Sequence, residues 1–502
     1  MELRRMTLGM TVLAVLLTAA AGHLMGFSFA TIEQKISDFT LDNGLKFIVM
    51  EDHSAPVVSF VTLADVGGAD DPQGYGGLAH VFEHMAFKGT DEIGTEDYAA
   101  EQVALDSLDA IYKELRAEEL KGPQADSAAL AALTAKFEAA QQRCDSLVVD
   151  NEFSIIVERE GGIDLNAGTG YDETSYQSSF PSNKLELWFA LESRRFAHPV
   201  LRQLYKEKEV IKEERRMSTE SSPVGRMVEA FLGKAFSVHP YGRPLVGTMA
   251  DIGNVDKETA MAFFHKYYVP SNMIVAVVGD VTPKEIHRLA VEYFSSLPKV
   301  PEPERVMIQE PKQTEERRAV VADKSQPFLL MGFHRPSMLN SDDPVYDAIA
   351  DYLGQGRTSM LYKNLVKEKK IATSASAFSS FPGSKYACQF GIFVVPAKGM
   401  TAEQCEAEVE SEVEKLKSIV IPIEELNKIK ARAKASFVNQ LSSRLGMAGQ
   451  LVSYQNLFGD WRAMFNTLDK INAVTAEDIQ RVARDLFTKE NRTVAYIETT
   501  KE

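Results

Sequence analysis

The chain has few cysteines and fewer basic than acidic residues, and both shortages argue against particular classes of protein. Its 502 residues include only Cys144, Cys388 and Cys405, an odd number with no two at CxxC spacing. A disulfide scaffold and a cysteine-rich metal site are therefore not expected. Acidic residues number 71 against 55 basic ones, which gives a net charge of −16. Nucleic-acid phosphates are bound by clustered Lys and Arg, so this balance argues against a nucleic-acid partner.

Long apolar runs are also missing, except at the N-terminus. Arg4 and Arg5 precede an apolar segment at residues 11–22, and small residues at 19–21 and 28–30 fit a cleavage site. Residues 1–30 are therefore expected to be a signal peptide. The alternative is an uncleaved anchor in the inner membrane, because apolar character persists to residue 30 and approaches the length that spans a bilayer. Both alternatives predict an exported protein, periplasmic or otherwise extracytoplasmic.

An internal repeat predicts two similar lobes in the rest of the chain. Val255 and Val474 are 219 positions apart (474 − 255 = 219), and the same offset relates Asn272 to Asn491. In both copies a helical pattern is followed by this asparagine and an apolar strand. The prediction is an α+β fold with lobes at 31–299 and 317–502, each a mostly antiparallel sheet with helices packed on it. The alternative is chance similarity between two helix–strand units.

Two further segments complete the predicted domain organisation. Residues 300–316 are rich in proline and charge, which is typical of a linker between lobes. Residues 95–148 have a helical period on both sides of a Lys-Gly-Pro break at 121–123, which predicts a helical hairpin inserted into the first lobe. The hairpin is interpreted as a solvated scaffold arm, with a partner-binding arm as the alternative.

The pentapeptide HVFEH at residues 80–84 carries the main chemical signal. On a helix, residues four apart lie one turn apart on the same face. The imidazoles of His80 and His84 can therefore reach one cation at the roughly 2.0–2.1 Å of a zinc–nitrogen bond. Glu83 follows His80 by three residues, so its carboxylate lies beside that cation. The same pattern also arises by chance on protein surfaces, so a metal site needs a third ligand.

A candidate for the third ligand lies far downstream. Glu207 and Glu214 are seven residues apart in a charged segment with helical pattern, which puts both carboxylates on one helix face, two turns apart. One carboxylate could bind the metal while the other orients a ligand. Read alone, the segment is more typical of a solvated charged helix.

The order of these motifs resembles the pitrilysin/insulinase family of zinc peptidases, in the branch that includes the mitochondrial processing peptidase. The matching segments span most of the chain, and each is weak alone. They are GGLAHVFEHMAFKGT at 76–90, GGIDLNAGTGYDETSY at 161–176, the helical segment at 207–214, HPYGRPLVGT at 239–248, YYVPSNMIVAVVGD at 267–280 and YLGQGRTSMLYKNLVKEKKIA at 352–372. Their order makes the resemblance specific.

The resemblance implies a role for each candidate residue around the metal. His80, His84 and Glu214 would be the ligands of one Zn²⁺ ion per chain. Glu83 would be the general base, and Glu207 would support the ligands.

Two other residues are implied to bind substrate. Asn166 and Ala167 would lie on an edge strand near the cleft, which holds the substrate backbone by β-addition. The alternative for Asn166 is an asparagine in a turn.

Two departures from the family pattern bear on the insertion and on partners. His84 and Glu214 are 130 positions apart (214 − 84 = 130), more than the family usually has, and the insertion at 95–148 accounts for the excess. The substrate-gripping Arg and Tyr that the family often carries in the second lobe are missing, since Lys367 stands near the Arg position and no Tyr follows. The resemblance therefore implies a homo- or hetero-oligomer in which a related subunit supplies this pair.

The expected function is zinc-dependent hydrolysis of peptide bonds in oligopeptides or unfolded segments, with Glu83 as general base. The second lobe has no HxxEH counterpart and is expected to bind no metal and to help enclose the substrate. Three alternatives remain open. The chain could be a non-catalytic peptide-binding or assembly subunit of the same fold, an interaction module with an accidental motif, or a metallohydrolase that acts on other bonds.

Overall fold

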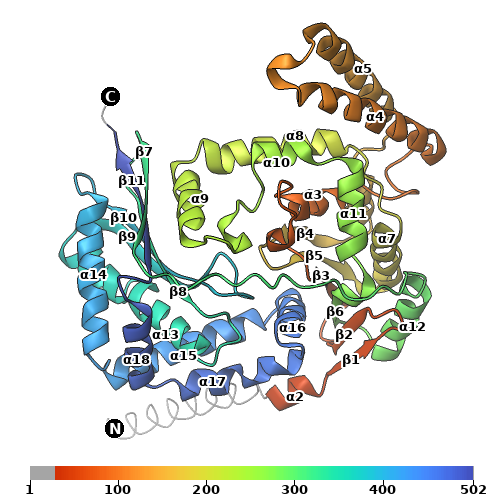
Figure 1. Cartoon of the computed structure of the whole chain (residues 1–502). Helices are drawn as coiled ribbons and strands as arrows, with labels where there is room; N and C mark the ends of the chain where they lie inside the picture. Colours follow the sequence, from red (N-terminus) through yellow and green to blue (C-terminus); the bar gives the residue numbers. More distant parts are fainter. Residues whose placement is uncertain (1–28, 501–502) are drawn as a thin grey trace, which may run out of the picture.

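Two mixed sheets, each packed with helices, form the body of the protein (Figure 1), which confirms the predicted α+β class. The computed structural model describes residues 29–500. The expected signal peptide or anchor at residues 1–30 lies almost entirely outside this range. Within residues 29–500, no helix has the length and apolar character needed to cross a membrane.

The first sheet positions the predicted metal helix and the predicted substrate strand. Its strands are β1 (Ile36–Thr40), β2 (Lys46–Glu51), β3 (Val57–Ala64), β4 (Ile163–Thr169), β5 (Thr174–Pro181) and β6 (Met273–Gly279). They lie in the order β1-β2-β6-β3-β5-β4, so β4 is at the sheet edge with β5 as its neighbour. All neighbouring pairs are antiparallel except β2 and β6, which run parallel.

The second sheet repeats this arrangement with one strand fewer. Its strands are β7 (Arg317–Asp323), β8 (Leu329–Arg335), β9 (Ala372–Phe381), β10 (Cys388–Pro396) and β11 (Arg492–Thr499). Their order, β7-β11-β8-β10-β9, matches β2-β6-β3-β5-β4 of the first sheet. Only β7 and β11 run parallel, as β2 and β6 do. Both sheets are thus mostly antiparallel, as predicted.

The repeated sequence corresponds to a repeated structural unit. In the first lobe α10 (Met249–Asn254) and α11 (Lys257–Tyr267) lead into β6, and in the second lobe α17 (Thr467–Ala473) and α18 (Ala476–Leu486) lead into β11. Asn272 donates hydrogen bonds to the carbonyls of Tyr267 and Asp65, at 2.9 and 3.2 Å. Asn491 does the same with the carbonyls of Leu486 and His334, at 3.0 and 2.9 Å. The repeated asparagine therefore ties helix end to strand start in both lobes.

One face of each sheet packs on helices of its own lobe. In the first lobe these are α3 (Leu78–Met85), α7 (Leu185–Ala197), α11 and α12 (Pro283–Phe294), around buried Phe47, Phe60 and Trp188. In the second lobe they are α13 (Asp343–Gly354), α14 (Ala402–Ser418), α15 (Ile423–Gln440) and α18, around buried Phe390 and Ile392. Burying each such side chain contributes roughly 1.5–3 kcal/mol, so these two cores supply much of the stability.

The other face of each sheet is covered by a helix from the opposite lobe. α16 (Arg444–Phe458) of the second lobe packs on the first sheet, where Leu451 joins Val61 and Val278 in one apolar cluster. α9 (Pro223–Ala235) of the first lobe packs on the second sheet, where Phe231 shares a cluster with Ile497. Each lobe therefore completes the core of the other. Residues 300–316, between the two sheets in sequence, contain no helix or strand.

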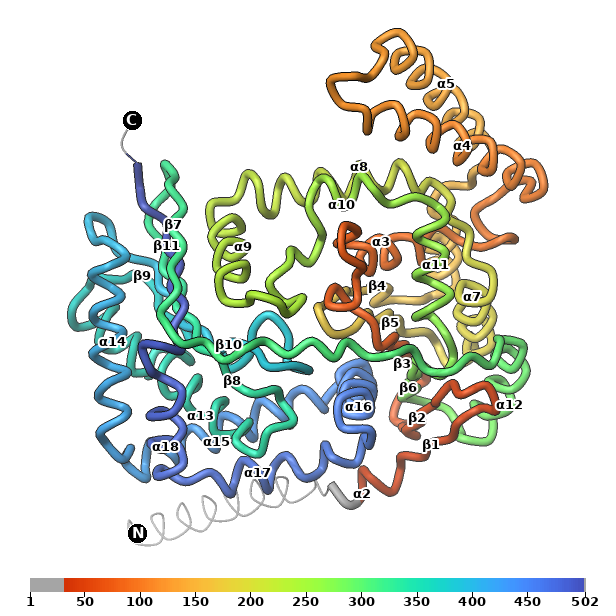
Figure 2. Tube along the Cα trace, viewed as in Figure 1, coloured from red at the N-terminus to blue at the C-terminus, as the bar shows by residue number. Residues whose placement is uncertain are grey.

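The helical hairpin predicted at 95–148 is present and projects from the first lobe (Figure 2). It consists of α4 (Tyr98–Glu119) and α5 (Ser127–Asp145). Its base is attached by a buried ion pair, in which Glu101 accepts hydrogen bonds of 2.6 and 2.8 Å from Arg202. The same guanidinium donates to the backbone carbonyls of Lys88, Thr90 and Ile93, so the insertion is tied to the chain that follows α3.

Candidate metal centre

α3 presents the HxxEH motif beside the first sheet. The helix begins after Gly77, which has a left-handed φ of +86° and no side chain that could cap the first turn. The buried carboxylate of Asp71 takes over this role, accepting hydrogen bonds from the backbone N–H groups of Gly77 and Ala79 at 2.7 and 2.9 Å. The apolar residues of the helix pack in the core, which fixes its rotation. Helical spacing then places His80 and His84 one turn apart.

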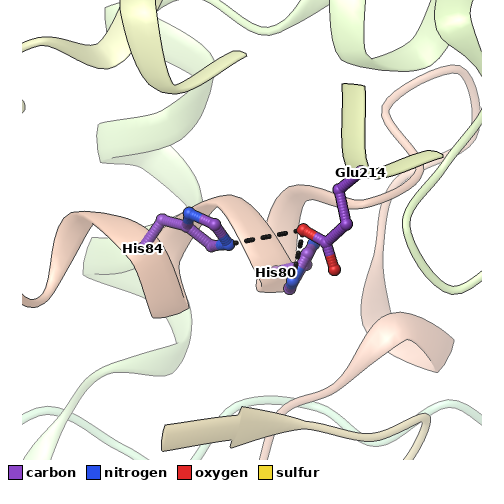
Figure 3. A group of neighbouring side chains, drawn as sticks. All are labelled: His80, His84 and Glu214. Carbon is purple, nitrogen blue, oxygen red and sulfur yellow. Dashed lines mark ion pairs between the residues drawn. The ribbon is translucent and has the colours of Figure 1, made fainter. Parts of the chain in front are cut away.

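His80, His84 and Glu214 bring three donor atoms together (Figure 3). Nε2 of His80 and Nε2 of His84 lie 3.8 and 3.7 Å from the same Glu214 oxygen, Oε2. The imidazole centroids are 4.8 Å apart and the rings are nearly perpendicular, with an interplanar angle of 84°. The folded chain therefore contains the expected cluster of two histidines and one distant carboxylate.

α8 (Leu204–Arg215) supplies two carboxylates that face α3 in different ways. The side chain of Glu214 is 45% exposed and reaches both imidazoles. The side chain of Glu207 is only 10% exposed, and its Oε2 lies 3.2 Å from Nδ1 of His84. Its other oxygen, Oε1, lies 2.5 Å from Nζ of Lys88. Glu207 thus orients His84 through Nδ1 and leaves Nε2 of that ring directed at Glu214.

The surroundings of these side chains set their protonation. Burial lowers the pKa of His80, which favours the neutral ring that binds metals. The hydrogen bond with Glu207 raises the pKa of His84. Burial acts to raise the pKa of Glu207, but hydrogen bonds from His84 and Lys88 outweigh it, so the pKa lies below its ordinary value. Glu207 is therefore a carboxylate at neutral pH.

The donor set fits a divalent cation. Two imidazole nitrogens and one carboxylate oxygen are a ligand set of catalytic zinc sites, which leave a fourth position open. Two ligands that each lie about 2.0–2.1 Å from a tetrahedral ion are roughly 3.3 Å from one another. The nitrogen–oxygen distances of 3.7 and 3.8 Å are within about half an ångström of this value, and all three donor atoms lie within 4.8 Å of one another. Within residues 29–500, this is the one group of three or more His, Cys, Asp or Glu side chains placed to hold a metal.

Glu83 lies on α3 next to His84, and its side chain is partly buried. Its negative charge acts on both imidazoles. In the described part of the chain, no hydrogen bond or ion pair engages its carboxylate. A carboxylate with unused lone pairs beside a metal site is suited to accept a proton.

Asn166 and Ala167 lie on β4, the edge strand that packs beside α3. They pair with Gln177 and Tyr176 of β5, and the opposite edge of β4 faces away from the sheet. Asn166 pairs with Gln177 within β4, directly after an irregularity in register, so the turn alternative for this residue is wrong. An extended peptide can add to such an edge through main-chain hydrogen bonds.

Among its described residues, the second lobe has no counterpart of the candidate metal site. α13, which follows β8 as α3 follows β3, carries no histidine. Its Asp343 pairs with Arg335 at 2.5 Å, and its Asp351 pairs with Arg432 of α15. These aspartates are thus neutralised by arginines. Lys367 lies in a π-helical turn, Tyr362–Glu368.

Two residues around the site escaped the sequence analysis. Asp71 caps the metal helix from outside it, and no local pattern indicates this, because the cap is six residues from Gly77. Lys88 holds Glu207, but it lies beyond the end of α3 at Met85, so no helical spacing indicates it.

Two family models match the chain. Residues 46–105 match "Insulinase (Peptidase family M16)". Residues 254–433 match "Peptidase M16 inactive domain". Among curated proteins, "Zinc protease PqqE" of Helicobacter pylori is 28% identical over 476 residues, which cover 92% of this chain and 93% of the relative. "Uncharacterized zinc protease YmxG" of Bacillus subtilis is 22% identical over 459 residues, which cover 91% and 96%.

Solved structures have the same fold. A protease from Helicobacter pylori superposes with a TM-score of 0.77 at 26% identity, covering 92% of this chain and 99% of that chain. The periplasmic protease PqqL from Escherichia coli superposes with a TM-score of 0.69 at 18% identity. That match covers 93% of this chain but 48% of PqqL, so this chain spans about half of the larger protease.

Proposed function

Because the chain belongs to the M16 (insulinase) family of zinc proteases, we propose that it hydrolyses peptide bonds in oligopeptides or unfolded segments with one Zn²⁺ per chain. One observation carries the proposal: Nε2 of His80, Nε2 of His84 and Oε2 of Glu214 converge beside an open sheet edge. Convergent donors and a place for an extended backbone are what a metallopeptidase requires.

His80, His84 and Glu214 would hold the ion. A bound zinc ion supplies Lewis acidity that lowers the pKa of water and polarises a carbonyl. Glu207 accepts a hydrogen bond from Nδ1–H of His84 and so keeps Nε2 of that ring free to bind. Lys88 in turn fixes Glu207.

Glu83 is proposed as the general base and acid. Its carboxylate takes a proton from water as the water oxygen bonds to the scissile carbonyl carbon. Glu83 then gives this proton to the amide nitrogen as the C–N bond breaks, so that one carboxylic acid and one amine leave. Asn166 and Ala167 on β4 would hold the substrate backbone in register for this step.

A second subunit is proposed to complete the substrate chamber. The superposition covers 93% of this chain but only 48% of PqqL, so the larger protease has the length of roughly two such units. The chain lacks the substrate-gripping Arg and Tyr of the family pattern, since Lys367 stands near the Arg position and no Tyr follows, and a second copy or a related chain would supply this pair. An extracytoplasmic location is supported by the apolar N-terminal segment and by the similarity to PqqL, a periplasmic protease.

The alternative of a non-catalytic subunit of the same fold is less well supported. All three donors are present, Glu83 is in place, and Glu207 and Lys88 orient a ligand. A chain used only for assembly has no need of this arrangement.

Zinc analysis and peptide cleavage test the proposal together. The chain without residues 1–30 is purified, its zinc content is measured, and cleavage of an unstructured peptide library is followed with and without a chelator. One zinc per chain and chelator-sensitive cleavage, restored by added zinc, are expected. A zinc-free protein, or cleavage that persists in excess chelator, would refute it. A related chain added to the assay reveals whether a partner is needed.

A further inference from the structure

The third metal ligand is held differently from the other two. His80 and His84 lie on α3, whose apolar face is packed in the first-lobe core. Glu214 lies near the end of α8, one residue before the helix ends at Arg215. Its side chain is 45% exposed, so little around the carboxylate itself fixes its position. The position of Glu214 therefore depends on what holds the end of α8.

The end of α8 is joined rigidly to α9. The chain passes through a π-helical turn, Arg216–Glu220, and α9 begins at Pro223. The buried guanidinium of Arg215 donates to Glu229 of α9 at 3.1 Å and to the carbonyl of Gly247 at 2.7 Å. At Gly225 an added Cβ would lie 2.1 Å from the carbonyl oxygen of Ser218, so the two segments are in direct backbone contact. A displacement of α9 therefore moves the residue next to Glu214.

α9 is in turn seated on the sheet of the second lobe. Phe231 is fully buried and lies against Gly332 of β8, where an added Cβ would be 2.2 Å from its Cζ. Arg226 forms an ion pair with Asp323 of β7. Nε2 of His334 lies 2.8 Å from the carbonyl oxygen of Ala235 at the end of α9. Strands β7 and β8 of the second sheet thus hold both ends and the middle of this helix.

We propose that the second lobe, whose described residues form no metal-binding group, positions the third metal ligand. The missing side chain of Gly332 leaves space for the ring of Phe231, which fixes the position of α9 on the second sheet. The contacts of Arg215 with Glu229 and Gly247 then fix the end of α8, and with it Glu214. Gly332 and Phe231 are positioning residues, since neither touches the metal donors. The inference rests on the proposed function only in taking His80, His84 and Glu214 as a metal site.

The substitution Gly332→Ala tests the inference. The new methyl group would lie 2.2 Å from Cζ of Phe231, so the ring must move. The other close atom is the terminal oxygen of the Gln389 side chain, at 2.8 Å. We expect zinc affinity, measured by chelator competition, to fall about tenfold or more. The visible spectrum of the Co²⁺-loaded protein should change with the ligand geometry. kcat should fall, whereas KM should stay near the wild-type value because β4 is untouched.

A compensating variant and a matched control separate positioning from general damage. Phe231→Leu in the Gly332→Ala background removes the clashing ring atoms and should restore zinc affinity. Ile392→Ala damages the same sheet on its opposite face, which packs on helices of the second lobe. Ile392→Ala should lower the denaturation midpoint but leave zinc affinity and the Co²⁺ spectrum unchanged.

Each outcome decides for or against the inference. If Gly332→Ala does not fold, Asp323→Asn replaces it. This substitution weakens the Arg226 ion pair, and its amide oxygen can still accept the hydrogen bond from the backbone N–H of Ser325. A two- to threefold loss of zinc affinity is expected, roughly the effect of a surface pair. Wild-type zinc affinity in the folded variant, or equal loss in Ile392→Ala, would overturn the inference. A wild-type chain that binds no zinc refutes the proposed function instead, so the two failures are distinguishable.

Discussion

Five strands have the same order in the two lobes, yet among the residues that the structure describes only the first lobe carries a candidate metal site. By chain order and packing, α13 corresponds to α3 and α15 corresponds to α8. Where α3 and α8 face each other, His80, His84 and Glu214 converge. Where α13 and α15 face each other, Asp351 and Arg432 form an ion pair. The same pair of helices can thus carry either a group of metal-binding side chains or an ion pair. The residue types on the facing sides of the two helices decide between them.

A second correspondence gives the metal-free lobe a role. α16 corresponds to α9, and each packs on the sheet of the opposite lobe. The first lobe therefore relies on the second for the seating of α9, which follows the helix that carries Glu214. A lobe without catalytic residues can be indispensable to the site through such an exchange.

Removing a donor from the first lobe should have the largest effect. His80→Ala or Glu214→Ala should reduce zinc from one per chain to nearly none. Loss of the metal removes several kcal/mol of transition-state stabilisation, or roughly 1,000-fold in rate. Metal analysis after gel filtration and peptide cleavage measure both. The matched control in the second lobe, Asp351→Ala, should retain zinc. Full zinc occupancy in both donor variants would show that the ligands are elsewhere.

Loss of the carboxylate that orients His84 should have an intermediate effect. Glu207→Gln keeps the shape of the side chain but weakens its hold on Nδ1 of His84. Zinc affinity should fall roughly 10- to 100-fold, as is usual for outer-shell partners. Chelator competition measures this. If affinity and rate both match those of the wild type, Glu207 does not orient the metal ligand.

Loss of the cation behind Glu207 should have a smaller effect. Lys88→Met removes the ammonium group 2.5 Å from Oε1 of Glu207 and should reduce zinc affinity roughly tenfold or less. Lys88→Arg supplies a replacement cation and should recover most of the loss. Equal defects in the two variants would point to disturbed packing rather than a lost charge.

Breaking the counterpart pair in the second lobe should have the smallest effect. Asp351→Asn weakens a partly exposed ion pair, which stabilises the fold by about 1 kcal/mol or less. Urea denaturation should show this small shift, with cleavage unchanged within about twofold. A large loss of cleavage would mean that the α13–α15 contact takes part in catalysis, and the comparison of the lobes would have to be revised.

Local patterns in the sequence predict much of the fold and part of the site. The spacing of His80 and His84 predicts their convergence, because one helical turn fixes it. The repeat around Asn272 and Asn491 predicts the duplicated lobes, since the asparagine has the same helix-to-strand role in each. The inserted hairpin was predicted by its helical period and its Gly-Pro break.

The features that the sequence could not predict depend on contacts between distant segments. The helix segment at 204–215 contains several glutamates, and only its packing on α3 shows that Glu214 faces both imidazoles while Glu207 faces Nδ1 of His84. The seating of Phe231 on Gly332 joins residues about a hundred positions apart with no shared pattern. The exchange of α9 and α16 likewise follows from which apolar faces meet after collapse, which periodicity within one helix does not specify.

The variant Glu83→Gln tests the central claim most directly. It removes the proposed proton acceptor and keeps all three donors, so zinc content and peptide cleavage are measured side by side with the wild type. The predicted result is one zinc per chain in both proteins, with cleavage by the variant reduced roughly 100- to 10,000-fold. Wild-type cleavage by a zinc-loaded Glu83→Gln protein would contradict the mechanism.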